Sequence, residues 1–462
     1  MESISKKALN SAQLNQIQGM REFFVKGGTQ DIHYRIKKLR ELEAHIRDNE
    51  AKIYQALHGD LGRTEYESYL VELSFVYDEI RYFAKNLESL ASRRRVSTSL
   101  ALFPATSEVH FQPRGLSLVI APWNYPFQLA MVPLIGSIAA GNVVILKPSE
   151  ISVATSEILK SVIESVFDSK HAMVVLGGPD ETNQLIDQDL DHIFFTGSTP
   201  VGKLIAKRAA NFLTPTVLEL GGKSPCIIHS SADLDLAAKR VLWAKYINAG
   251  QTCVAPDYIL IHDSVYSKFL EKIKFHFHRY SIDNPDFCKI VSSRHFNRLK
   301  GFLEESKVLI GGRIQESQSK IEISVVEGRP DGALMREEIF GPILPILKFS
   351  SEADIHSQID RNDYPLALYI FSNDQKFTDQ IIEARRSGGV CVNDLMVHLA
   401  SHEQPFGGIR YSGYGKYHRK YSFQAFSHER AVLRKSRYID PEFRYPPFPQ
   451  KIAKWMKWLV SN

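Results

Sequence analysis

The sequence predicts an α/β fold with a parallel sheet and crossover helices, and two observations support this prediction. Short apolar runs typical of buried strands alternate with helical stretches between residues 116 and 220. The strand-like runs are Leu116–Ala121, Val143–Lys147, Met173–Leu176, Ile193–Thr196 and Val217–Leu220. Polar or glycine-rich segments follow several of these runs, as expected where ligands bind at the carboxyl ends of parallel strands.

Helices are predicted before this region, and a second strand–helix series is predicted after it. The first 90 residues or so have apolar positions at helical spacing, which predicts packing helices. These positions are Ile36, Leu39, Leu42, Ile46, Ile53 and Leu57. After about residue 223 we expect a second α/β domain, with a strand at Tyr258–His262 and a helix near 266–279. The proline- and aromatic-rich segment from Pro441 to Pro449 predicts an extended tail.

The composition is that of an ordinary globular protein with more than one domain. A chain of 462 residues is too long for a single core, and a formal net charge of +5 is too small for a dedicated nucleic-acid binder. The start, MESISKKALN, lacks the apolar core and cleavage site of a secretory signal. No run of about 18 apolar residues offers a membrane span. We therefore expect a cytoplasmic protein.

The four cysteines predict neither a disulfide framework nor a metal site, because they are sparse and lack metal-like spacing. Cys226 and Cys391 lie in apolar, strand-like segments and are expected in the core, whereas Cys288 has no informative context. Cys253 differs, since it follows Gly250-Gln251-Thr252 in a polar loop. A thiol there becomes a catalyst only where its thiolate is favoured, and the sequence does not show that environment.

A possible nucleotide-binding segment runs from Phe195 to Gly202, where a predicted strand leads into a helix expected over Val201–Asn211. Gly197, Ser198 and Gly202 lie in it, and a glycine-lined helix N-terminus offers free N–H groups to a pyrophosphate. The usual G-x-G-x-x-G pattern is absent. The two glycines therefore suit a tight turn and close packing equally well.

Lys147 ends a predicted strand and Glu150 follows three residues later. A lysine and a carboxylate at that place suit the ribose hydroxyls of adenosine, and the carboxylate would also repel a 2′-phosphate. From these two residues alone, an ordinary solvent-facing pair is the simpler interpretation.

Glu219 and Asn124 are candidates for acid–base and oxyanion chemistry. Glu219 ends an apolar strand before two glycines, and carboxylates at such places can have raised pKa values and act as general bases. Asn124 lies between Pro122 and Pro126, and a rigidly held amide can donate a hydrogen bond to an oxyanion. Taken singly, a salt bridge for Glu219 and an Asx turn for Asn124 are the simpler interpretations.

Five motifs in order, F-T-G-S-T, E-L-G-G-K-S-P, G-Q-T-C, E-E-I-F-G-P and P-F-G-G, resemble the aldehyde dehydrogenase superfamily from about residue 30 to 435. The segments Gly250–Tyr258, Asn393-Asp394 and Ser401-His402, with the short N-terminal region, resemble its class 3 branch, which includes enzymes for medium-chain, aromatic and fatty aldehydes. The resemblance implies NAD(P)-dependent oxidation of an aldehyde to a carboxylic acid through a cysteine thioester.

The resemblance also implies roles for the candidate residues. Cys253 would attack the aldehyde, while the Asn124 amide and the Cys253 N–H hold the oxyanion. Glu219 would activate the water that hydrolyses the thioester. Glu338, a second carboxylate considered for that task, would with Phe340 position the nicotinamide ribose and ring.

For the cofactor, the resemblance implies that Lys147 and Glu150 contact the adenosine ribose, and that Gly197 and Ser198, beside Gly202, approach the pyrophosphate. NAD is the first expectation and NADP remains open. The resemblance further implies a Rossmann-like nucleotide domain (1–94 and 117–222), a catalytic α/β domain (223–430), and bridging elements with a C-terminal tail (95–116 and 431–462). A hairpin strand near Glu108–Gln112 and a homodimer follow from it.

Two departures from the family pattern are Arg410 and Arg419, which stand where small residues or glycine are common, so they are expected to alter the substrate entrance. Two other functions remain open. One is a coenzyme-A-acylating enzyme, which commonly lacks the base at Glu219, and the other is a catalytically silent nucleotide-binding structural protein. Residues 451–460 predict a short amphipathic helix that contacts a membrane surface or docks on the enzyme or its dimer partner.

Overall fold

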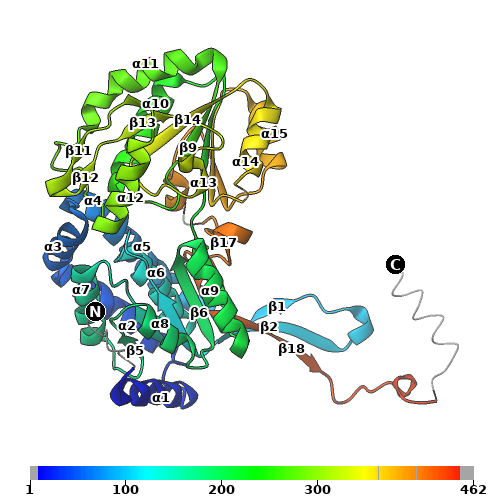
Figure 1. The fold of residues 1–462 in the computed structure, drawn as a ribbon. Coiled ribbons are helices and arrows are strands. Elements are labelled where there is room, and N and C mark those ends of the chain that lie inside the picture. Colours follow the sequence, from blue (N-terminus) through cyan, green and yellow to red (C-terminus); the bar gives the residue numbers. More distant parts are fainter. Residues whose placement is uncertain (1–8, 363, 402, 448–462) are drawn as a thin grey trace.

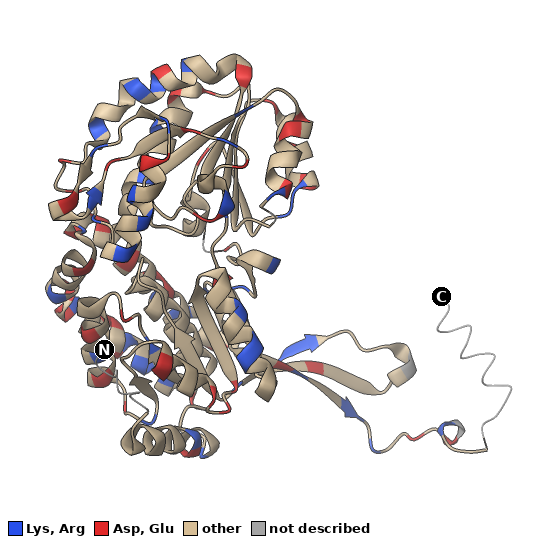
Figure 2. Ribbon diagram, viewed as in Figure 1, with Lys and Arg blue, Asp and Glu red and all other residues tan. Residues whose placement is uncertain are grey.

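The computed structural model describes residues 9–362, 364–401 and 403–447. In Figure 1 these residues form two bodies, one above the other, each built on a sheet, and a thin arm extends from the lower body. Basic and acidic residues are spread over the helices on the outside of both bodies (Figure 2). Among the described helices, none is long and apolar enough to cross a membrane.

The N-terminal region is helical, as predicted. Its helices are α1 (Ser11–Val25), α2 (Ile32–Asp48), α3 (Glu50–Leu61), α4 (Glu65–Ser68) and α5 (Ser74–Leu90), with a π-helical turn, η1 (Tyr69–Leu73), between the last two. The six apolar positions noted in the sequence are all buried, and they share a core with apolar residues of the sheet below. The packing role expected for these helices is confirmed.

The lower body contains a six-stranded sheet in the order β17-β7-β6-β3-β4-β5. Its strands are β3 (Leu116–Ile120), β4 (Val143–Lys147), β5 (Ala172–Val174), β6 (His192–Gly197), β7 (Thr216–Leu220) and β17 (Gly413–Tyr414). All are parallel except β17, which is antiparallel to β7. The five strands predicted from the sequence are therefore present, with ends shifted by one or two residues.

Four helices connect these strands: α6 (Gln128–Ala140), α7 (Val153–Val166), α8 (Pro179–Ile186) and α9 (Thr199–Ala209). Helix α9 begins two residues before the expected Val201, because Pro200 lies in its first turn, where a missing N–H and a fixed φ suit a helix. The connection between β3 and α6 contains Asn124, and the connection between β6 and α9 contains Ser198.

The upper body contains a seven-stranded sheet in the order β10-β13-β14-β9-β8-β15-β16, parallel except for β10. The strands are β8 (Pro225–Ile228), β9 (Tyr258–His262), β10 (Val308–Ile310), β13 (Ser324–Glu327), β14 (Ile343–Phe349), β15 (Ala367–Phe371) and β16 (Gly389–Val392). A small pair, β11 (Ile314–Gln315) and β12 (Lys320–Ile321), lies beside it. Its helices are α10 (Leu234–Tyr246), α11 (Tyr266–Phe277), α12 (Ser293–Glu304), α13 (Ala333–Arg336), α14 (Glu352–Asp360) and α15 (Gln375–Ala384).

The arm is a three-stranded antiparallel sheet of β1 (Arg94–Val96), β2 (Ala105–Pro113) and β18 (Ser427–Lys435). Strand β18 pairs with β2 over its whole length, from Ser427 opposite Pro113 to Lys435 opposite Ala105. The hairpin strand expected near Glu108–Gln112 is therefore confirmed. Helix α16 (Lys420–Ala425) precedes β18 and packs on α6, so part of the range 223–430 expected for the catalytic domain lies against the lower body.

Of the tail predicted from Pro441 to Pro449, residues 441–447 are described, and they contain one 3-10 turn at Glu442–Arg444 and otherwise neither helix nor strand. The N–H groups of Arg444 and Tyr445 donate to the carbonyl oxygens of Pro441 and Glu442, the i to i+3 pattern of such a turn, so the ring nitrogen of Pro441 does not need to donate. The helix predicted over residues 451–460 lies outside the described residues.

The connection between the two main sheets places the site. Strand β7 ends at Leu220 and β8 begins at Pro225, so the chain passes from the carboxyl edge of the lower sheet to the amino edge of the upper one within four residues. Loops that follow β3, β6 and β7 therefore face the loop that precedes β9.

Candidate active site

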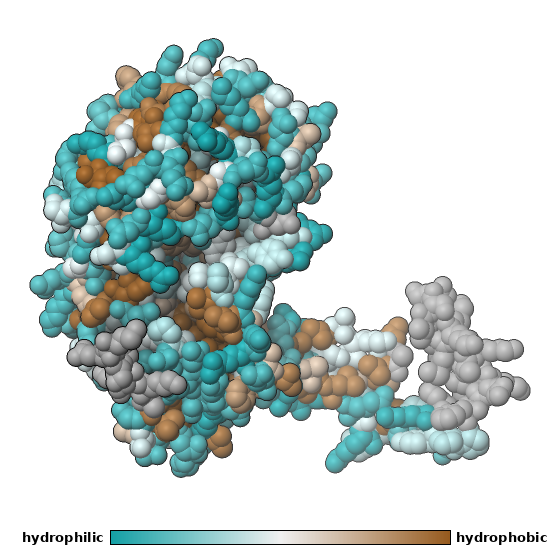
Figure 3. Space-filling model, viewed as in Figure 1, coloured by the Kyte–Doolittle hydropathy of each residue, from teal (hydrophilic) through white to brown (hydrophobic). Residues whose placement is uncertain are grey.

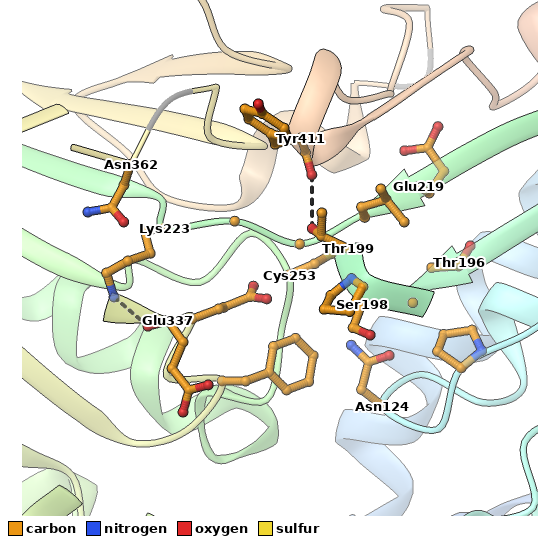
Figure 4. A pocket seen from close by; sticks show the side chains of 18 of the residues that line it. Asn124, Thr196, Ser198, Thr199, Glu219, Lys223, Cys253, Glu337, Asn362 and Tyr411 are labelled. Carbon is orange, nitrogen blue, oxygen red and sulfur yellow. Dashed lines mark hydrogen bonds between the residues drawn. The ribbon is translucent and has the colours of Figure 1, made fainter. Parts of the chain in front are cut away.

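A cavity of about 720 Å³ lies where the two bodies meet. Seven of the ten residues proposed from the sequence line it: Asn124, Gly197, Ser198, Glu219, Cys253, Glu338 and Phe340. Figure 4 shows several of them around the open space. Lys147, Glu150 and Gly202 do not line the cavity. The loop ends of two different sheets thus bring together residues that are more than 200 positions apart in the sequence.

The loop that presents Cys253 has an unusual backbone. Asn248, Ala249 and Gly250 have φ values of 51°, 49° and 68°, all in the left-handed region. A Cβ at Gly250 would lie 2.4 Å from the carbonyl oxygen of Gly341, so both the backbone conformation and the space require glycine there. Such strain persists only where surrounding contacts hold it in place.

Buried hydrogen bonds support this loop. The side chain of Gln251 donates to the carbonyl oxygens of Asn248 and Lys289 at 3.0 and 3.1 Å, and its own oxygen accepts from the N–H of Val291 at 3.0 Å. Lys245, also buried, donates to the carbonyl oxygen of Gly341 at 2.9 Å. The nucleophile candidate therefore sits on a loop whose shape is set by its neighbours.

The Cys253 thiol is protonated at neutral pH in this environment. Burial, together with the nearby carboxylates of Glu338 and Glu219, raises its pKa to about 12, although the N–H groups of Cys253 and Val254 act to lower it. A thiol of this kind needs a base to remove its proton before it can attack a carbonyl carbon. Two buried carboxyl groups close enough to influence it are available for that task.

Glu219 lies on β7, one residue before the strand ends, and only 3% of its surface is exposed. Neither of its carboxylate oxygens has a hydrogen-bond partner among the described residues, and burial raises its pKa well above the usual value. The salt bridge considered for Glu219 from the sequence is therefore wrong, because within the described part of the chain no cation forms an ion pair with it. A raised pKa makes the ionised form of this side chain a stronger base than an ordinary carboxylate.

Asn124 is held in the loop between β3 and α6, with 3% of its surface exposed. Its Nδ2 donates to the carbonyl oxygen of Gln251 at 3.1 Å, which uses one of two amide hydrogens. The hydroxyl groups of the neighbouring residues Tyr125 and Thr252 form a second contact between the same two loops, with their oxygens 2.5 Å apart. Hydrogen bonds thus hold the loop of Asn124 against the loop of Cys253, and the second hydrogen of Asn124 Nδ2 can donate to a ligand.

At the other end of the cavity, β6 passes into the N-terminus of α9. Gly197, Ser198, Thr199 and Pro200 line the cavity, and no side chain caps the first turn of α9. The hydroxyl of Thr199 donates to the carbonyl oxygen of Tyr411 at 2.9 Å, the contact dashed in Figure 4. Free N–H groups at a helix N-terminus favour an anion such as a pyrophosphate.

The remaining three sequence candidates have other surroundings. Gly202 is buried against Leu220, and a Cβ there would lie 2.6 Å from Leu220 Cδ2, so it permits close packing of α9 on β7. Lys147 is only 2% exposed, which excludes an ordinary solvent-facing pair, and its Nζ donates to the carbonyl oxygen of Pro148 at 2.6 Å. Glu150 is half-exposed with Oε2 3.6 Å from Lys147 Nζ.

Residues of α12 that the sequence analysis missed hold Glu338 and Phe340. His295 Nε2 lies 2.7 Å from the carbonyl oxygen of Phe340, and Arg298 donates to the carbonyl oxygen of Glu338 at 3.2 Å. Lys223, also missed, is buried and donates to Asp257 and to the carbonyl oxygen of Glu337. The spacing of three between His295 and Arg298 was the available signal, because it places both on one face of a helix.

Glu338 has a raised pKa, to about 8, caused first by burial and then by the charge of Asp257, while the N–H of Gly222 lowers it. A Cβ at Gly221 would lie 2.0 Å from Glu338 Oε2, so the glycine allows the carboxylate to approach the backbone. Unlike Glu219, Glu338 is thus engaged by a backbone donor.

Arg410 and Arg419, the two departures from the family pattern, differ in their relation to the cavity. The Arg410 guanidinium lies over the rings of Tyr364 and Tyr411, which line the cavity, at 4.8 and 5.3 Å. Arg419 instead forms ion pairs with Asp78 and Glu403 at 2.9 and 2.5 Å and does not line the cavity. That Arg419 alters the substrate entrance stays a prediction.

The other three cysteines are free thiols outside the cavity. Cys226 is buried as expected, whereas Cys391 is only half-buried, so its expected place in the core is wrong. Strand β16, which contains Cys391, is the edge of its sheet and leaves that side chain partly uncovered. The described residues contain no group of three His, Cys, Asp or Glu that could hold a metal ion.

Comparison with known proteins identifies a family whose motifs include residues that line this cavity. The model of the aldehyde dehydrogenase family matches residues 8–432. The chain belongs to the aldehyde dehydrogenase family. Among its relatives, aldehyde dehydrogenase family 3 member A2 of Rattus norvegicus is 40% identical over 96% of this chain and 93% of that protein. The 4,4′-diaponeurosporen-aldehyde dehydrogenase of Staphylococcus aureus is 40% identical over 95% of this chain and 97% of that protein.

A third relative, the dimeric NADP-preferring aldehyde dehydrogenase of Rattus norvegicus, is 41% identical over 94% of this chain and 97% of that protein. The solved substrate-bound state of Staphylococcus aureus AldH has a TM-score of 0.95 and 38% identity, and the match covers 98% of this chain and all of that one. The class 3 resemblance and the aldehyde dehydrogenase fold are confirmed.

Proposed function

We propose that this protein oxidises an aldehyde to a carboxylic acid with NAD(P), through a thioester on Cys253. The observation that supports the proposal most is the convergence of Cys253, Asn124 and the unpartnered Glu219 in one cavity. A dinucleotide fits the same cavity, because the uncapped N-terminus of α9 suits its pyrophosphate and the carboxylate of Glu338 suits ribose hydroxyls. A nicotinamide bound there would supply the acceptor for the hydride that leaves the aldehyde carbon.

In the first half of the reaction, Cys253 Sγ forms a bond to the carbonyl carbon while its proton passes to a buried carboxylate. The carbonyl oxygen becomes negative, and the free hydrogen of Asn124 Nδ2 and the N–H of Cys253 stabilise it. When the hydride leaves, the oxygen recovers its double bond and a thioester remains on Cys253. Donors that are already in place do not need to reorganise during this step.

In the second half, water attacks the thioester carbon and Glu219 accepts a proton from that water. The carbon–sulfur bond breaks, the carboxylic acid leaves, and the thiol of Cys253 recovers a proton. We assign the base role to Glu219 rather than Glu338, because no donor of the described residues engages Glu219, whereas a backbone N–H and contacts from α12 hold the Glu338 segment.

The alternatives are less well supported. A coenzyme-A-acylating enzyme does not need a base for water, yet Glu219 is buried beside the thiol at a cost in desolvation. A catalytically silent structural protein would gain nothing from a buried carboxyl group that destabilises the fold in this way. The strained loop at Asn248–Gly250 argues in the same direction, since such strain is typical of functional sites.

For the cofactor, NAD is our first choice and NADP remains open. Glu150, at the end of β4 beside Lys147, places a negative charge where the adenosine ribose would bind in a sheet of this kind. A relative at 41% identity is named NADP-preferring, so the carboxylate alone does not decide the matter.

We further propose a separate role for each domain and the formation of a homodimer. Residues 1–94 and 117–222 would bind the dinucleotide, residues 223–430 would supply the nucleophile, and 95–116 with 431–462 would bridge subunits. The arm supports this last part, because it exposes Leu100, Phe103 and Leu433 at 79%, 72% and 50%, and hydrophobic atoms follow its length in Figure 3. A cytoplasmic location and a membrane contact by residues 451–460 remain predictions.

The proposal is tested by measuring NAD(P)H formation with benzaldehyde, hexanal and a long-chain aldehyde, each with NAD and NADP. We expect turnover of at least one of these aldehydes without added coenzyme A. Turnover that requires coenzyme A, or no turnover with any pair, would contradict the proposal.

A further inference from the structure

A buried cluster of three ionisable side chains lies beside the proposed site, in a region that the sequence analysis assigned to packing. Arg63 lies in the connection from α3 to α4, Glu67 on α4, and Glu72 in the π-helical turn η1. Arg63, Glu67 and Glu72 are 1%, 4% and 0% exposed. None of them lines the cavity, so the proposed mechanism does not use them directly.

On one side, the cluster holds the loop of the oxyanion candidate. Arg63 forms a buried ion pair with Glu72, donates to the backbone carbonyl oxygen of Asn124, and lies 4.5 Å over the ring of Tyr125. Glu72 accepts hydrogen bonds from the N–H groups of Phe127 and Gln128 at 3.1 and 2.6 Å. Arg63 and Glu72 thus fix both ends of the Asn124–Gln128 segment, at the start of α6.

On the other side, the cluster holds the loop of the nucleophile candidate. Glu67 Oε1 accepts a hydrogen bond from the N–H of Asn248 at 2.8 Å, and Glu67 Oε2 accepts one from the thiol of Cys288 at 3.4 Å. Asn248 is the first residue of the left-handed segment that leads to Cys253. Its side chain in turn donates to the carbonyl oxygens of Asn124 and Gln251 at 3.0 and 2.9 Å.

We propose that Arg63, Glu67 and Glu72 are positioning residues that set the separation between the Asn124 amide and the Cys253 thiol. This inference rests on the proposed function of those two groups. The carboxylate of Glu67 reaches one loop, Arg63 and Glu72 reach the other, and Arg63 Nε lies 3.9 Å from Glu67 Oε1, so one ionic cluster links both loops.

The chemistry of the cluster favours positioning over simple packing. Desolvating three ionisable groups is costly, and apolar residues of similar volume often stabilise a core as well or better. Charged hydrogen bonds are short and directional, which suits the placement of two backbone segments. The π-helical turn that carries Glu72 is an irregularity found most often at functional sites. A displacement of about 1 Å in such an arrangement can cost about 100-fold in rate.

The test compares Glu67→Gln with Glu67→Leu. Glutamine retains an oxygen that accepts from the N–H of Asn248, whereas leucine has a similar volume and no acceptor. The measurements are the rate of the pre-steady-state NAD(P)H burst, the steady-state kcat and KM, dinucleotide affinity, and the melting temperature. For Glu67→Leu we expect at least about a tenfold slower burst and a lower kcat, with KM and dinucleotide affinity nearly unchanged. Glu67→Gln is expected to recover most of the burst rate.

Glu79→Leu is the matched control. Glu79, on α5, is another buried carboxylate, 3% exposed, that accepts from a backbone N–H, that of Arg419, at 2.8 and 3.0 Å. Its hydrogen bonds are to Arg419 and Ser422, and neither residue belongs to the Asn124 loop or the Cys253 loop. We expect this variant to lose stability but to keep the burst rate. Equal loss of burst rate in Glu79→Leu and Glu67→Leu would overturn the proposal, as would an unchanged burst rate in Glu67→Leu.

If Glu67→Leu does not fold, the kinetics of Arg63→Lys test the proposal instead. A single ammonium cannot reproduce the two-directional donation of a guanidinium to Glu72 and to the Asn124 carbonyl. We therefore expect a lower kcat at unchanged KM in folded Arg63→Lys, and an unchanged kcat would overturn the proposal. Failure of the proposed function is a separate result, because the unmodified protein would then form no NAD(P)H with aldehydes.

Discussion

Replacing Glu219 with glutamine removes the proposed base while leaving the shape of the buried side chain almost unchanged. Glu219 is buried, its oxygens have no partner among the described residues, and its raised pKa favours the neutral carboxyl form. A neutral amide therefore resembles the resident group, and we expect the variant to fold and to acylate Cys253. Hydrolysis of the thioester should slow by about 10² to 10⁴-fold, or about 3 to 5 kcal/mol, the usual contribution of a general base.

Stopped-flow absorbance of NADH separates the two halves of the reaction in this variant. We expect a burst close to one NADH per active site, followed by a slow steady state limited by hydrolysis. In the unmodified protein the hydrolysis rate should rise with pH as Glu219 loses its proton, and this rise should vanish in Glu219→Gln. Steady-state turnover within about threefold of the unmodified protein would refute the assignment. Glu338→Gln, measured in parallel, then reports whether the second carboxylate is the base.

Four further outcomes follow from the same geometry. The pKa of Glu219 is higher in the folded protein than in the unfolded chain, so the buried carboxyl group lowers stability as pH rises from the unfolded pKa to the folded pKa. The melting temperature of Glu219→Gln should therefore exceed that of the unmodified protein by an amount that grows with pH. A difference in melting temperature that does not grow with pH would contradict the burial of this group. Cys253→Ser should abolish oxidation yet keep dinucleotide binding, measured by fluorescence titration, and retained turnover would place the nucleophile elsewhere. Glu150→Gln should raise the ratio of kcat/KM for NADP to that for NAD, and an unchanged ratio would mean that this carboxylate does not face the 2′ position. Gly250→Ala should lower the free energy of unfolding by about 1 to 3 kcal/mol in urea titration, because φ is +68° and its Cβ would meet the Gly341 carbonyl; equal stability would show that the loop relaxes freely.

Local patterns in the sequence were sufficient for the strands, and motifs that resemble a known family indicated the candidate site residues. Buried parallel strands are continuous apolar runs, so β3, β4, β6 and β7 could be located to within one or two residues. Asn124 and Cys253 lie in loops after or before such strands and Glu219 lies near the end of β7, all within motifs whose order resembles a known family. Each of these signals is contained in a short stretch of chain, which is why no tertiary information was needed.

Short-range patterns in the sequence did not predict which groups a polar side chain contacts or whether it is buried. The sequence alone allowed a surface pair for Lys147 and a salt bridge for Glu219, whereas the structure buries both and gives Glu219 no cation. It also suggested that Cys391 lies in the core, since an edge strand and a central strand have the same apolar pattern. Burial depends on what packs over a strand, and that is decided by distant parts of the chain.

The sequence by itself determined the order of strands and helices, because that order depends on residue type and spacing, and the resemblance of its motifs to a known family implied the reacting groups. Only the tertiary structure decided how those groups are held: Arg63 and Glu67 reach the Asn124 and Cys253 loops across 61 and 181 positions of sequence. Arg298 likewise reaches the Glu338 segment from 40 positions away. A hydrogen bond depends on distance in space, and over such separations distance is set by the packing of whole sheets and helices rather than by any local pattern.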